Sequence, residues 1–177
     1  MPITVFVVDD HAIVREGLAS LLAAQPDLSV IGTAADGRDA LRQVAKLLPD
    51  VVIVDISMPQ MNGIEAAREI RDRVPQTRLV ILSMHSSVEH VFHALEAGAR
   101  GYVLKESAGK EIIDAVRAVH AGRRYLSPRV AEMMAEVVGR HARASPLNRL
   151  SGRERQIMQL VAEGRSSVQI AATLHLS

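Results

Sequence analysis

The sequence has no cysteine, no tryptophan, and only two tyrosines and two phenylalanines among 177 residues. Without cysteine there can be no disulfide framework and no thiolate metal site. So few aromatic side chains argue against a protein that stacks the bases of single-stranded nucleic acid. No apolar run approaches the roughly 20 residues that a membrane-spanning helix needs. The N-terminus lacks the basic start of a signal peptide, so we expect a cytoplasmic protein with no membrane partner.

Charge is unevenly distributed along the chain, although the net formal charge is only +1. Residues 1–121 hold 12 basic and 16 acidic side chains, whereas residues 122–177 hold 9 arginines and 4 glutamates. An acidic first part joined to a basic second part suggests two tasks, the second directed at an anion such as DNA. The length suits one domain of ordinary size followed by part of another.

Apolar segments that favour strands alternate with segments of helical periodicity over the first 121 residues. Helices are expected at residues 11–24, 36–47, 63–73, 87–98 and 108–121. Five consecutive β-then-α units predict a five-stranded, parallel, doubly wound α/β sheet of the flavodoxin-like kind, with helices on both faces. The expected strands are Ile3–Val8, Leu28–Ala34, Val51–Asp55, Arg78–Ser83 and Gly101–Leu104.

Single residues mark the ends and the buried faces of these helices. Asp36 and Ser87 stand where N-caps are expected. In the helix at residues 87–98, helical spacing places Val91 and Phe92 on the face toward the core.

The stretch at residues 51–63, VVIVDISMPQMNG, is the centre of the pattern. Its continuous apolar run is typical of a strand buried on both faces, as in a parallel sheet. Asp55 lies at the carboxyl end of that strand, which is where open parallel sheets bind ligands. Pro59 stiffens the loop that follows, and Gly63 allows it to turn.

Acidic residues follow two strands that are neighbours in a doubly wound sheet. Asp9 and Asp10 come directly after the first strand and Asp55 ends the third, so three carboxylates should meet at one edge. Clustered carboxylates repel one another and raise one another's pKa unless a cation lies among them. Mg²⁺ is the expected cation, since this hard ion takes oxygen ligands and recruits phosphate oxygens.

Two further strands end in groups that suit phosphoryl transfer. The fourth strand ends at the hydroxyl of Ser83, and Lys105 follows the fifth. A metal ion and an ammonium would offset charge on phosphoryl oxygens, and a carboxylate nucleophile would form an aspartyl phosphate. Taken singly, each residue is more simply a helix cap, a strand-end hydroxyl or a solvated lysine. Their joint occurrence at the ends of four strands favours a site.

Residues 3–121 resemble the receiver domain of bacterial two-component response regulators. The resemblance rests on VVDDH, VDISMPQMNG, LSMHS and GYVLKES at the first, third, fourth and fifth strands. It implies that Asp55 is the phosphoacceptor, that a sensor histidine kinase is the phosphoryl donor and that Mg²⁺ is the cofactor. The roles implied for individual residues are Mg²⁺ ligands at Asp9, Asp10, Asp55 and the backbone carbonyl of Ser57, a catalytic lysine at Lys105, a catalytic and switch hydroxyl at Ser83, and a rotating switch aromatic at Tyr102.

Two positions depart from the family pattern. Met84 follows the switch hydroxyl where the family often has a small residue, so its side chain is expected to narrow access to the phosphoryl group. Met84→Ala should then change the rate of phosphoryl loss. Glu106 follows Lys105 where many receivers have proline, so a cis peptide is not implied. Tyr102 equally suits an ordinary half-buried strand residue, and only the resemblance favours its switch role.

Residues 122–149 are interpreted as a linker that contains one helix. Ser127 and Pro128 suit the N-cap and the first position of a helix near residues 128–138. The residues after that helix are small, polar and basic, with no periodicity.

Residues 150–177 are interpreted as part of an all-α helix-turn-helix domain. Ser151 and Glu154 form a capping box, and Gly164 separates two short helices. LSGRERQIMQLVAEGRSSVQIAATLHLS resembles the opening of the LuxR-type helix-turn-helix of NarL/FixJ response regulators. That resemblance places the start of the recognition helix at Ser177, so we expect a C-terminally truncated chain.

Such a chain should not read the base edges of DNA, because that takes a helix inserted into the major groove. Arg153, Arg155 and Arg165 could contact phosphates, but solvated helix faces explain them equally well. We therefore expect weak, salt-dependent DNA binding by this chain and specific duplex binding by a full-length version.

The leading hypothesis is a DNA-binding transcription regulator that is switched by phosphorylation of Asp55. The added charge would draw Ser83 inward, let Tyr102 follow, and shift the population toward a state that frees or dimerises the effector helices. A homodimer is therefore expected on phosphorylation. The protein would not be an enzyme in the ordinary sense, since it takes part only in its own phosphorylation and dephosphorylation.

Two alternatives remain open. A phosphohydrolase of the haloacid-dehalogenase type also uses an aspartate nucleophile, but that nucleophile follows the first strand, whereas Asp55 follows the third. An inert protein-interaction module with a receiver fold is the other, and the complete set of site residues argues against it. Turnover of small phosphate esters would favour the first, and failure to bind beryllium fluoride with Mg²⁺ would favour the second.

Overall fold

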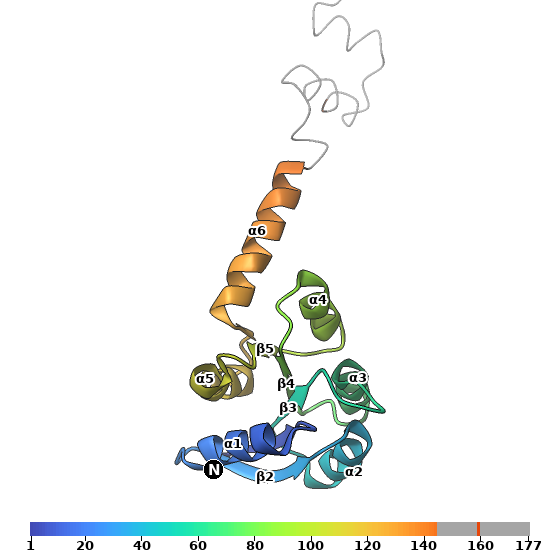
Figure 1. Ribbon diagram of the computed structural model, residues 1–177, viewed down its shortest axis with the longest axis vertical. Coiled ribbons are helices and arrows are strands. Elements are labelled where there is room, and N and C mark those ends of the chain that lie inside the picture. Colours follow the sequence, from blue (N-terminus) through green and yellow to red (C-terminus); the bar gives the residue numbers. More distant parts are fainter. Residues whose placement is uncertain (145–158, 160–177) are drawn as a thin grey trace, which may run out of the picture. The chain divides into compact units, whose positions relative to one another are not determined.

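Six parallel strands form one sheet in the computed structural model, which describes residues 1–144 and residue 159, with side chains for residues 1–137 and 159. The strand order is β2-β1-β3-β4-β5-β6, and all neighbouring pairs run parallel (Figure 1). The bounds of the first five strands coincide with the predicted ones, which confirms the parallel α/β fold class. The strands are β1 Ile3–Val8, β2 Leu28–Ala34, β3 Val51–Asp55, β4 Arg78–Ser83, β5 Gly101–Leu104 and β6 Tyr125–Leu126.

Five helices connect the strands and cover both faces of the sheet. Helices α1 and α5 lie on one face, and α2, α3 and α4 lie on the other (Figure 1). Each helix runs from the end of one strand to the start of the next, so groups that follow the strands gather at a single edge. The helices are α1 Ala12–Ala23, α2 Gly37–Leu47, α3 Gly63–Arg73, α4 Val88–Glu96 and α5 Ala108–His120.

Strand β3 lies inside the sheet and is buried along its whole length, as its continuous apolar run predicts. On the face covered by α1 and α5, aliphatic side chains of the strands and helices form one cluster. Burial of each such side chain contributes roughly 1.5–3 kcal/mol, so Asp55 is held at the end of a rigid strand. The cluster includes Val5, Val7, Leu18, Leu22, Ile53, Leu82, Ile112 and Val116.

Strand β6 lies where only a linker was predicted. The amide of Tyr125 donates to the carbonyl of Arg100 at 2.9 Å, and the amide of Ser127 donates to the carbonyl of Tyr102 at 2.9 Å. The helix that follows, α6 Pro128–Ala144, continues past the predicted end at residue 138. The glycine at position 139 does not end it, because glycine inside a helix costs only about 1 kcal/mol relative to alanine.

The hydroxyl of Ser127, predicted as a helix cap, serves the core instead. Ser127 is buried, and its Oγ accepts a hydrogen bond from the amide of Leu104 at 3.1 Å. The same hydroxyl donates to Glu111 Oε2. Ser127 therefore ties the start of α6 to β5 and α5.

Asp36 and Ser87 occupy the N-cap positions of α2 and α4 as predicted, but the expectation that Ser87 makes a capping bond is wrong. Asp36 Oδ1 accepts from the amide of Asp39 at 2.8 Å. Ser87 precedes α4 but makes no capping bond, because its Oγ lies 2.6 Å from Nδ1 of His90. The prediction for Phe92 is also wrong, since that side chain is 55% exposed. Helix α4 buries a narrow stripe, Val91 and Ala94, which leaves no inward position for Phe92.

The chain divides into two compact units, Met1–Met133 and Met134–Ser177. The proposed domain boundaries at residues 121 and 149 stay predictions. The sequence features assigned to the helix-turn-helix lie outside the described residues: Ser151, Glu154, Gly164, Ser177, and the three arginines Arg153, Arg155 and Arg165.

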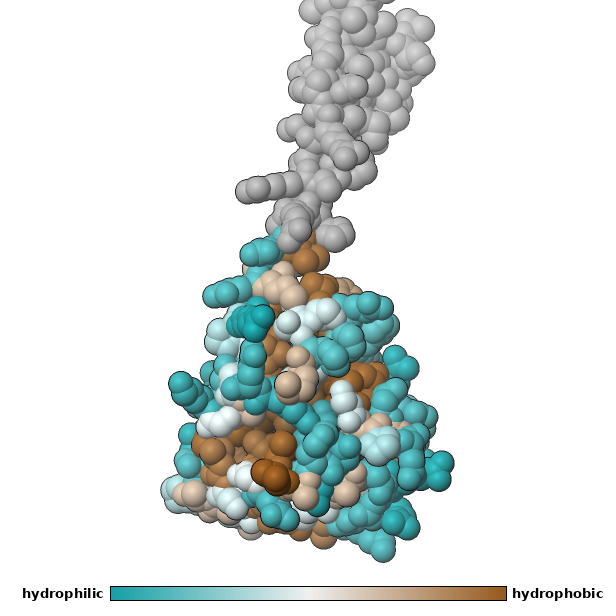
Figure 2. Space-filling model, viewed as in Figure 1, coloured by the Kyte–Doolittle hydropathy of each residue, from teal (hydrophilic) through white to brown (hydrophobic). Residues whose placement is uncertain are grey.

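The surface is mainly polar on the face shown in Figure 2, with one larger apolar area at its lower left and smaller apolar areas elsewhere. Isolated exposed apolar side chains are normal for a folded protein. Among the described helices, none is long and apolar enough to cross a membrane. The large hydrophobic side chains that are exposed in the described part are Met1, Ile13, Leu47, Leu48, Met84 and Phe92.

Candidate functional site

The parallel register brings the predicted carboxylates together. Val8 of β1 pairs with Val54 of β3, so the next residues, Asp9 and Asp55, are neighbours at the carboxyl edge of the sheet. The side chain of Asp9 is 0% exposed and that of Asp55 is 1% exposed. Asp10 lies at the rim, with 27% of its side chain exposed. Three carboxylates therefore meet at one end of two adjacent strands, as the sequence predicts.

Lys105 bridges two of these carboxylates. Its Nζ lies 2.8 Å from Asp55 Oδ2 and 2.9 Å from Asp9 Oδ2, and only 10% of the side chain is exposed. Burial alone would lower the pKa of Lys105, but pairing with the carboxylates of Asp55 and then Asp9 outweighs it and raises that pKa above its ordinary value. One ammonium thus pairs with two of the three carboxylates, which leaves the cluster with an excess of negative charge.

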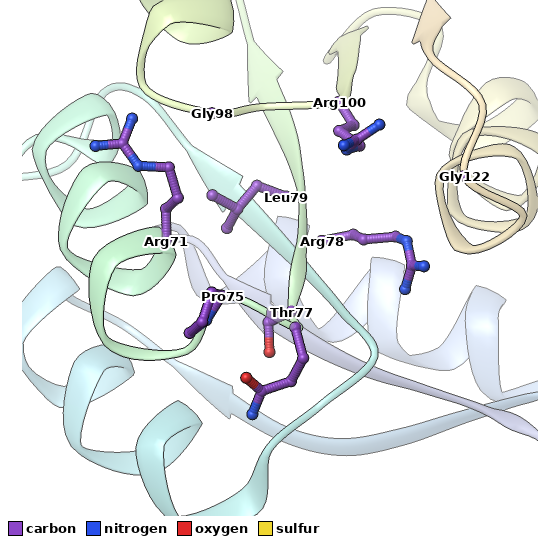
Figure 3. A pocket seen from close by; sticks show the side chains of 9 residues that line it. Arg71, Pro75, Thr77, Arg78, Leu79, Gly98, Arg100 and Gly122 are labelled. Carbon is purple, nitrogen blue, oxygen red and sulfur yellow. The ribbon is translucent and has the colours of Figure 1, made fainter.

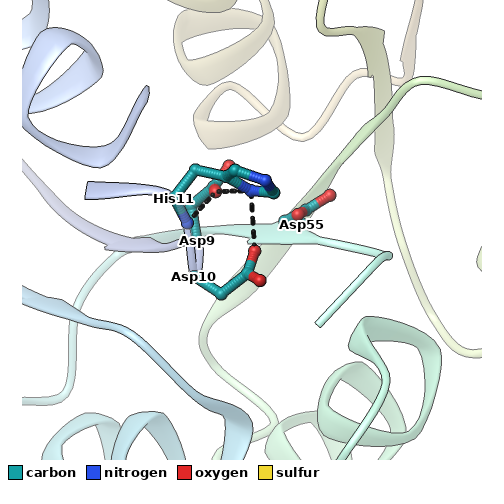
Figure 4. Close-up of side chains that lie close together, drawn as sticks. All are labelled: Asp9, Asp10, His11 and Asp55. Atoms are coloured by element: carbon teal, nitrogen blue, oxygen red, sulfur yellow. Dashed lines mark hydrogen bonds and ion pairs between the residues drawn. The ribbon is translucent and has the colours of Figure 1, made fainter. Parts of the chain in front are cut away.

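The acidic cluster fits a hard cation. One ligand atom from each of Asp9, Asp10, His11 and Asp55 lies within 4.8 Å of the others (Figure 4). Asp9 Oδ2 and Asp10 Oδ1 are buried and accept no hydrogen bond of good geometry from the described residues, although Lys105 Nζ and His11 Nδ1 each lie 2.9 Å away. Oxygen atoms that are buried without a full set of donors suit an ion that prefers carboxylate ligands.

His11 and Arg15 are members of this site that the sequence reasoning missed. The amide of His11 donates to Asp9 Oδ1 at 2.9 Å, and its Nδ1 lies 2.9 Å from Asp10 Oδ1. Nη1 of Arg15 donates to the backbone carbonyl of Asp9 at 2.7 Å. A signal was present for both residues, since His11 directly follows the two aspartates and Arg15 stands one helical turn after His11.

The residues predicted to form the switch meet at one backbone position, His85. Ser83 is fully buried, and its Oγ accepts from the amide of His85 at 2.9 Å. Tyr102 is fully buried too, and its hydroxyl donates to the carbonyl of His85 at 2.6 Å. Burial raises the pKa of Tyr102, and the Ser83 hydroxyl offsets this only in part. The imidazole of His85 stacks on that of His90 in α4, with ring centroids 4.6 Å apart.

Gly63 is needed for close approach rather than for a turn. A Cβ at this position would overlap the carbonyl oxygen of Asp55 and stand 2.9 Å from Cα of Ile56. The amide of Gly63 donates to the carbonyl of Ile56 at 2.9 Å. The amide of Ser57 donates to Asp55 Oδ1 at 3.2 Å. The loop after β3 therefore packs directly against the backbone of Asp55.

The two positions that depart from the family pattern lie at the surface. Met84 is 68% exposed, next to the buried Ser83. Glu106 Oε1 pairs with Arg129 Nη1 at 2.7 Å, and both side chains are more than half exposed. An exposed pair of this kind contributes about 0–1 kcal/mol to stability.

Comparison with known proteins gives matches over both parts of the chain. The family described as Response regulator receiver domain matches residues 5–117, and the family described as Bacterial regulatory proteins, luxR family, matches residues 148–177. The DNA-binding transcriptional activator DevR/DosR of Mycobacterium tuberculosis is 40% identical over 176 residues, which are 99% of this chain and 81% of that protein.

Solved structures agree with these matches. A LuxR-family two-component response regulator from an Aurantimonas species is 40% identical, with a TM-score of 0.74, over 77% of this chain and 97% of that one. The two-component response regulator RcsB in its DNA complex is 26% identical, with a TM-score of 0.72, over 100% of this chain and 85% of that one.

Proposed function

The chain belongs to the two-component response regulators that join a receiver domain to a LuxR-type DNA-binding domain, and on this basis we propose that Asp55 is its phosphoacceptor. Its function is that of a two-component transcription regulator. In the mechanism that we propose, a sensor histidine kinase donates a phosphoryl group to Asp55, and the phosphorylated site changes the state of the DNA-binding part.

The observation that carries this proposal is the buried pair of Asp55 and Lys105 beside two further carboxylates. Asp55 Oδ2 lies 2.8 Å from Lys105 Nζ, and Asp55 Oδ1 accepts from the amide of Ser57. Contacts at both oxygens fix the orientation of the carboxylate. A nucleophile that is already oriented reacts faster, because part of the entropic barrier is removed in advance.

The transfer step is a displacement at phosphorus. A carboxylate oxygen of Asp55 forms a bond to phosphorus while the bond from phosphorus to the donor's histidine nitrogen breaks. The electron pair of that bond leaves with the imidazole, which then takes up a proton. Lys105 lies against the nucleophile, so its ammonium can stabilise negative charge on a phosphoryl oxygen, and the Ser83 hydroxyl can donate to another.

Mg²⁺ is the cation that we propose for the acidic cluster. Asp9, Asp10, Asp55 and the backbone carbonyl of Ser57 would hold it. When bound, Mg²⁺ would supply electrostatic stabilisation of the phosphoryl oxygens. The excess of carboxylate charge and the buried acceptors of Asp9 and Asp10 support this assignment.

The contacts of His85 suggest how phosphorylation would act on the fold. A phosphoryl oxygen that attracts the Ser83 hydroxyl would compete with the amide of His85, which donates to the same Oγ. The loop between β4 and α4 would then move, and Tyr102 with it, because Tyr102 is bonded to the carbonyl of His85. A shift between two such packings is the usual form of a phosphorylation switch.

We extend the proposal to a homodimer on phosphorylation and to weak, salt-dependent DNA binding through residues 148–177. The DNA complex of RcsB supports the proposed DNA binding, since RcsB is similar to this chain over 100% of this chain's length. A cytoplasmic location stays a prediction.

The test is labelling of the chain by acetyl phosphate with Mg²⁺, followed by mass spectrometry. We expect one phosphoryl group per chain on Asp55, no label after chelation of the metal, and no label on Asp55→Asn. The matched control is Asp114→Asn, which changes an exposed aspartate of α5 and should label normally.

Two results would contradict the proposal. A label that persists in Asp55→Asn would place the phosphoacceptor elsewhere. Sustained release of inorganic phosphate from small phosphate esters, in large excess over protein, would indicate a phosphohydrolase.

A further inference from the structure

The amino ends of strands β4, β5 and β6 carry a row of arginines, at the edge of the sheet opposite to the carboxylates. Arg78 is the first residue of β4, Arg100 directly precedes β5, and Arg123 and Arg124 directly precede β6. Gly101 pairs with Tyr125, so the residues before them, Arg100 and Arg124, stand at neighbouring positions. Adjacent strands lie about 4.8 Å apart, and like charges at facing positions destabilise a sheet. Negative charge bound beside the row would therefore reduce the repulsion between its members.

No ion pair with a carboxylate of the same region supplies that charge. Across the side chains of residues 1–137, no ion pair joins Arg78, Arg100, Arg123 or Arg124 to an acidic group. Asp50 interacts electrostatically with Arg78 but forms no ion pair with it, and its Oδ2 accepts from the amide and the hydroxyl of Thr4, at 2.8 and 2.6 Å. Most other arginines with described side chains do have partners, for example Arg117 with Asp27 at 2.7 Å.

A cleft of about 540 Å³ opens at this row of arginines (Figure 3). On one side Arg71 is engaged, since it donates to Asp72 Oδ1 at 2.8 Å and to the carbonyl of Glu96 at 3.1 Å. Arg78 and Arg100 instead extend toward the turn at Gly122 (Figure 3). The volume lies in the range of small-molecule sites. No lining residue is aromatic, so the cleft offers no surface for stacking a base.

We propose that this cleft binds a small phosphate-bearing anion through Arg78 and Arg100, with Arg124 adding positive charge from β6. The guanidinium group is suited to this, because its planar fork donates two parallel hydrogen bonds to one phosphate. The site lies at the edge opposite to Asp55 and does not depend on phosphorylation. The competing role for the same arginines is to offset the negative ends of α3, α4 and α5, which lead into this edge. That role needs no ligand.

The experiment uses the full chain and inorganic tripolyphosphate in metal-free buffer at constant ionic strength. Calorimetry gives the affinity, and amide chemical shifts give the location. We expect saturable binding, with the largest shifts at Thr77, Arg100 and Gly122, and at least a tenfold weaker affinity in Arg100→Ala. The matched control is Arg68→Ala, which removes an exposed arginine of α3 outside the cleft and should leave affinity unchanged.

Several results would overturn the site. One is the absence of saturable shifts at the cleft. If Arg100→Ala also loses thermal stability in that case, the arginines serve to offset the helix ends. Another is equal affinity of Arg100→Ala and the unaltered chain. Binding only of long polyanions such as duplex DNA would assign the affinity to a macromolecular surface. If Arg100→Ala folds poorly, Arg78→Gln replaces it, and shift mapping on the unaltered chain needs no variant.

Discussion

The two edges of the same sheet hold charge in opposite ways. At the carboxyl edge, Asp9 and Asp55 are almost fully buried and share the ammonium of Lys105. At the amino edge, Arg100 is exposed and no ion pair joins it to a described carboxylate. Parallel topology explains why residues that follow the strands gather at one edge and residues that precede them gather at the other, since all strands run in the same direction. Burial explains why the charges are paired at one edge and not at the other, because a buried charge must be paired, whereas an exposed charge is solvated by water.

The largest loss of stability is expected at Gly63, which packs against the backbone of Asp55 at the carboxyl edge. In Gly63→Ala the new Cβ would overlap the carbonyl of Asp55, and backbone atoms cannot move aside as a flexible side chain can. We expect a loss of about 4 kcal/mol in the free energy of unfolding, above the usual range for overpacking. Urea denaturation measures the loss, and acetyl phosphate labelling of the remaining folded protein should fall with it.

The control for this variant is Gly109→Ala in α5. Nothing lies within 4 Å of a Cβ at Gly109, so the alanine should be neutral or should stabilise the helix by up to about 1 kcal/mol. Equal stability of Gly63→Ala and the unaltered chain would show that the loop after β3 does not constrain Asp55.

Removal of the ammonium of Lys105 from the carboxyl edge should cause the next largest loss of stability. In Lys105→Met the carboxylates of Asp9 and Asp55 stay buried without a counter-charge, which costs about 3 kcal/mol of unfolding free energy in metal-free buffer. Added Mg²⁺ should restore part of the loss, because the ion replaces the missing positive charge. Urea denaturation with chelator and with Mg²⁺ gives both values.

Lys110→Met is the matched control, since Lys110 is an exposed lysine of α5. Its stability should change by less than about 0.5 kcal/mol and should not depend on Mg²⁺. A Lys105→Met variant that is as stable as the unaltered chain without metal would mean that the carboxylates protonate or rehydrate at little cost.

The carboxyl edge could be predicted from sequence because each of its residues directly follows an apolar strand. The parallel order then makes Asp9 and Asp55 neighbours without any knowledge of side-chain positions. The place of His11 could not be derived in this way, since it depends on how the imidazole turns toward Asp10. The role of Gly63 could not be derived either, because glycine is required both at a turn and at a close backbone contact.

The amino edge and β6 were missed for a different reason. Two residues, Tyr125 and Leu126, are too few to show a strand period, and their pairing is decided by backbone groups of Arg100 and Tyr102. The exposure of Phe92 could not be predicted either, because helical spacing alone does not say how wide a stripe of the helix the adjoining elements bury. Solitary arginines before strands look like solvated loop residues, and only the register shows that they form a row.

Asp50 allows a pH test of the amino edge. Burial opposes the charged form of Asp50, but hydrogen bonds from Thr4 outweigh it and lower the pKa of this carboxyl. A lowered pKa means that the stabilisation is complete above the unfolded value near 3.9 and is lost as the pH falls through the folded value. A double-mutant cycle of Asp50→Asn and Thr4→Val should give about 1 kcal/mol of coupling at pH 7 and progressively less as the pH falls below the unfolded value. A coupling energy that does not change with pH would show that it does not depend on the ionisation of Asp50.

The smallest effect should come from Arg100→Met, the counterpart of Lys105→Met at the opposite edge. Both changes replace a cation with an apolar side chain of similar length, so they differ mainly in the burial and pairing of the charge that is lost. Because Arg100 is exposed and leaves no buried carboxylate behind, its loss should alter the free energy of unfolding by less than about 0.5 kcal/mol. Relief of repulsion with Arg124 could make the change slightly stabilising, and added salt should reduce that gain. Urea denaturation of the two methionine variants in one buffer measures the contrast directly. A loss in Arg100→Met as large as that in Lys105→Met would mean that the amino edge is also held by paired charge, and the contrast between the two edges would fail.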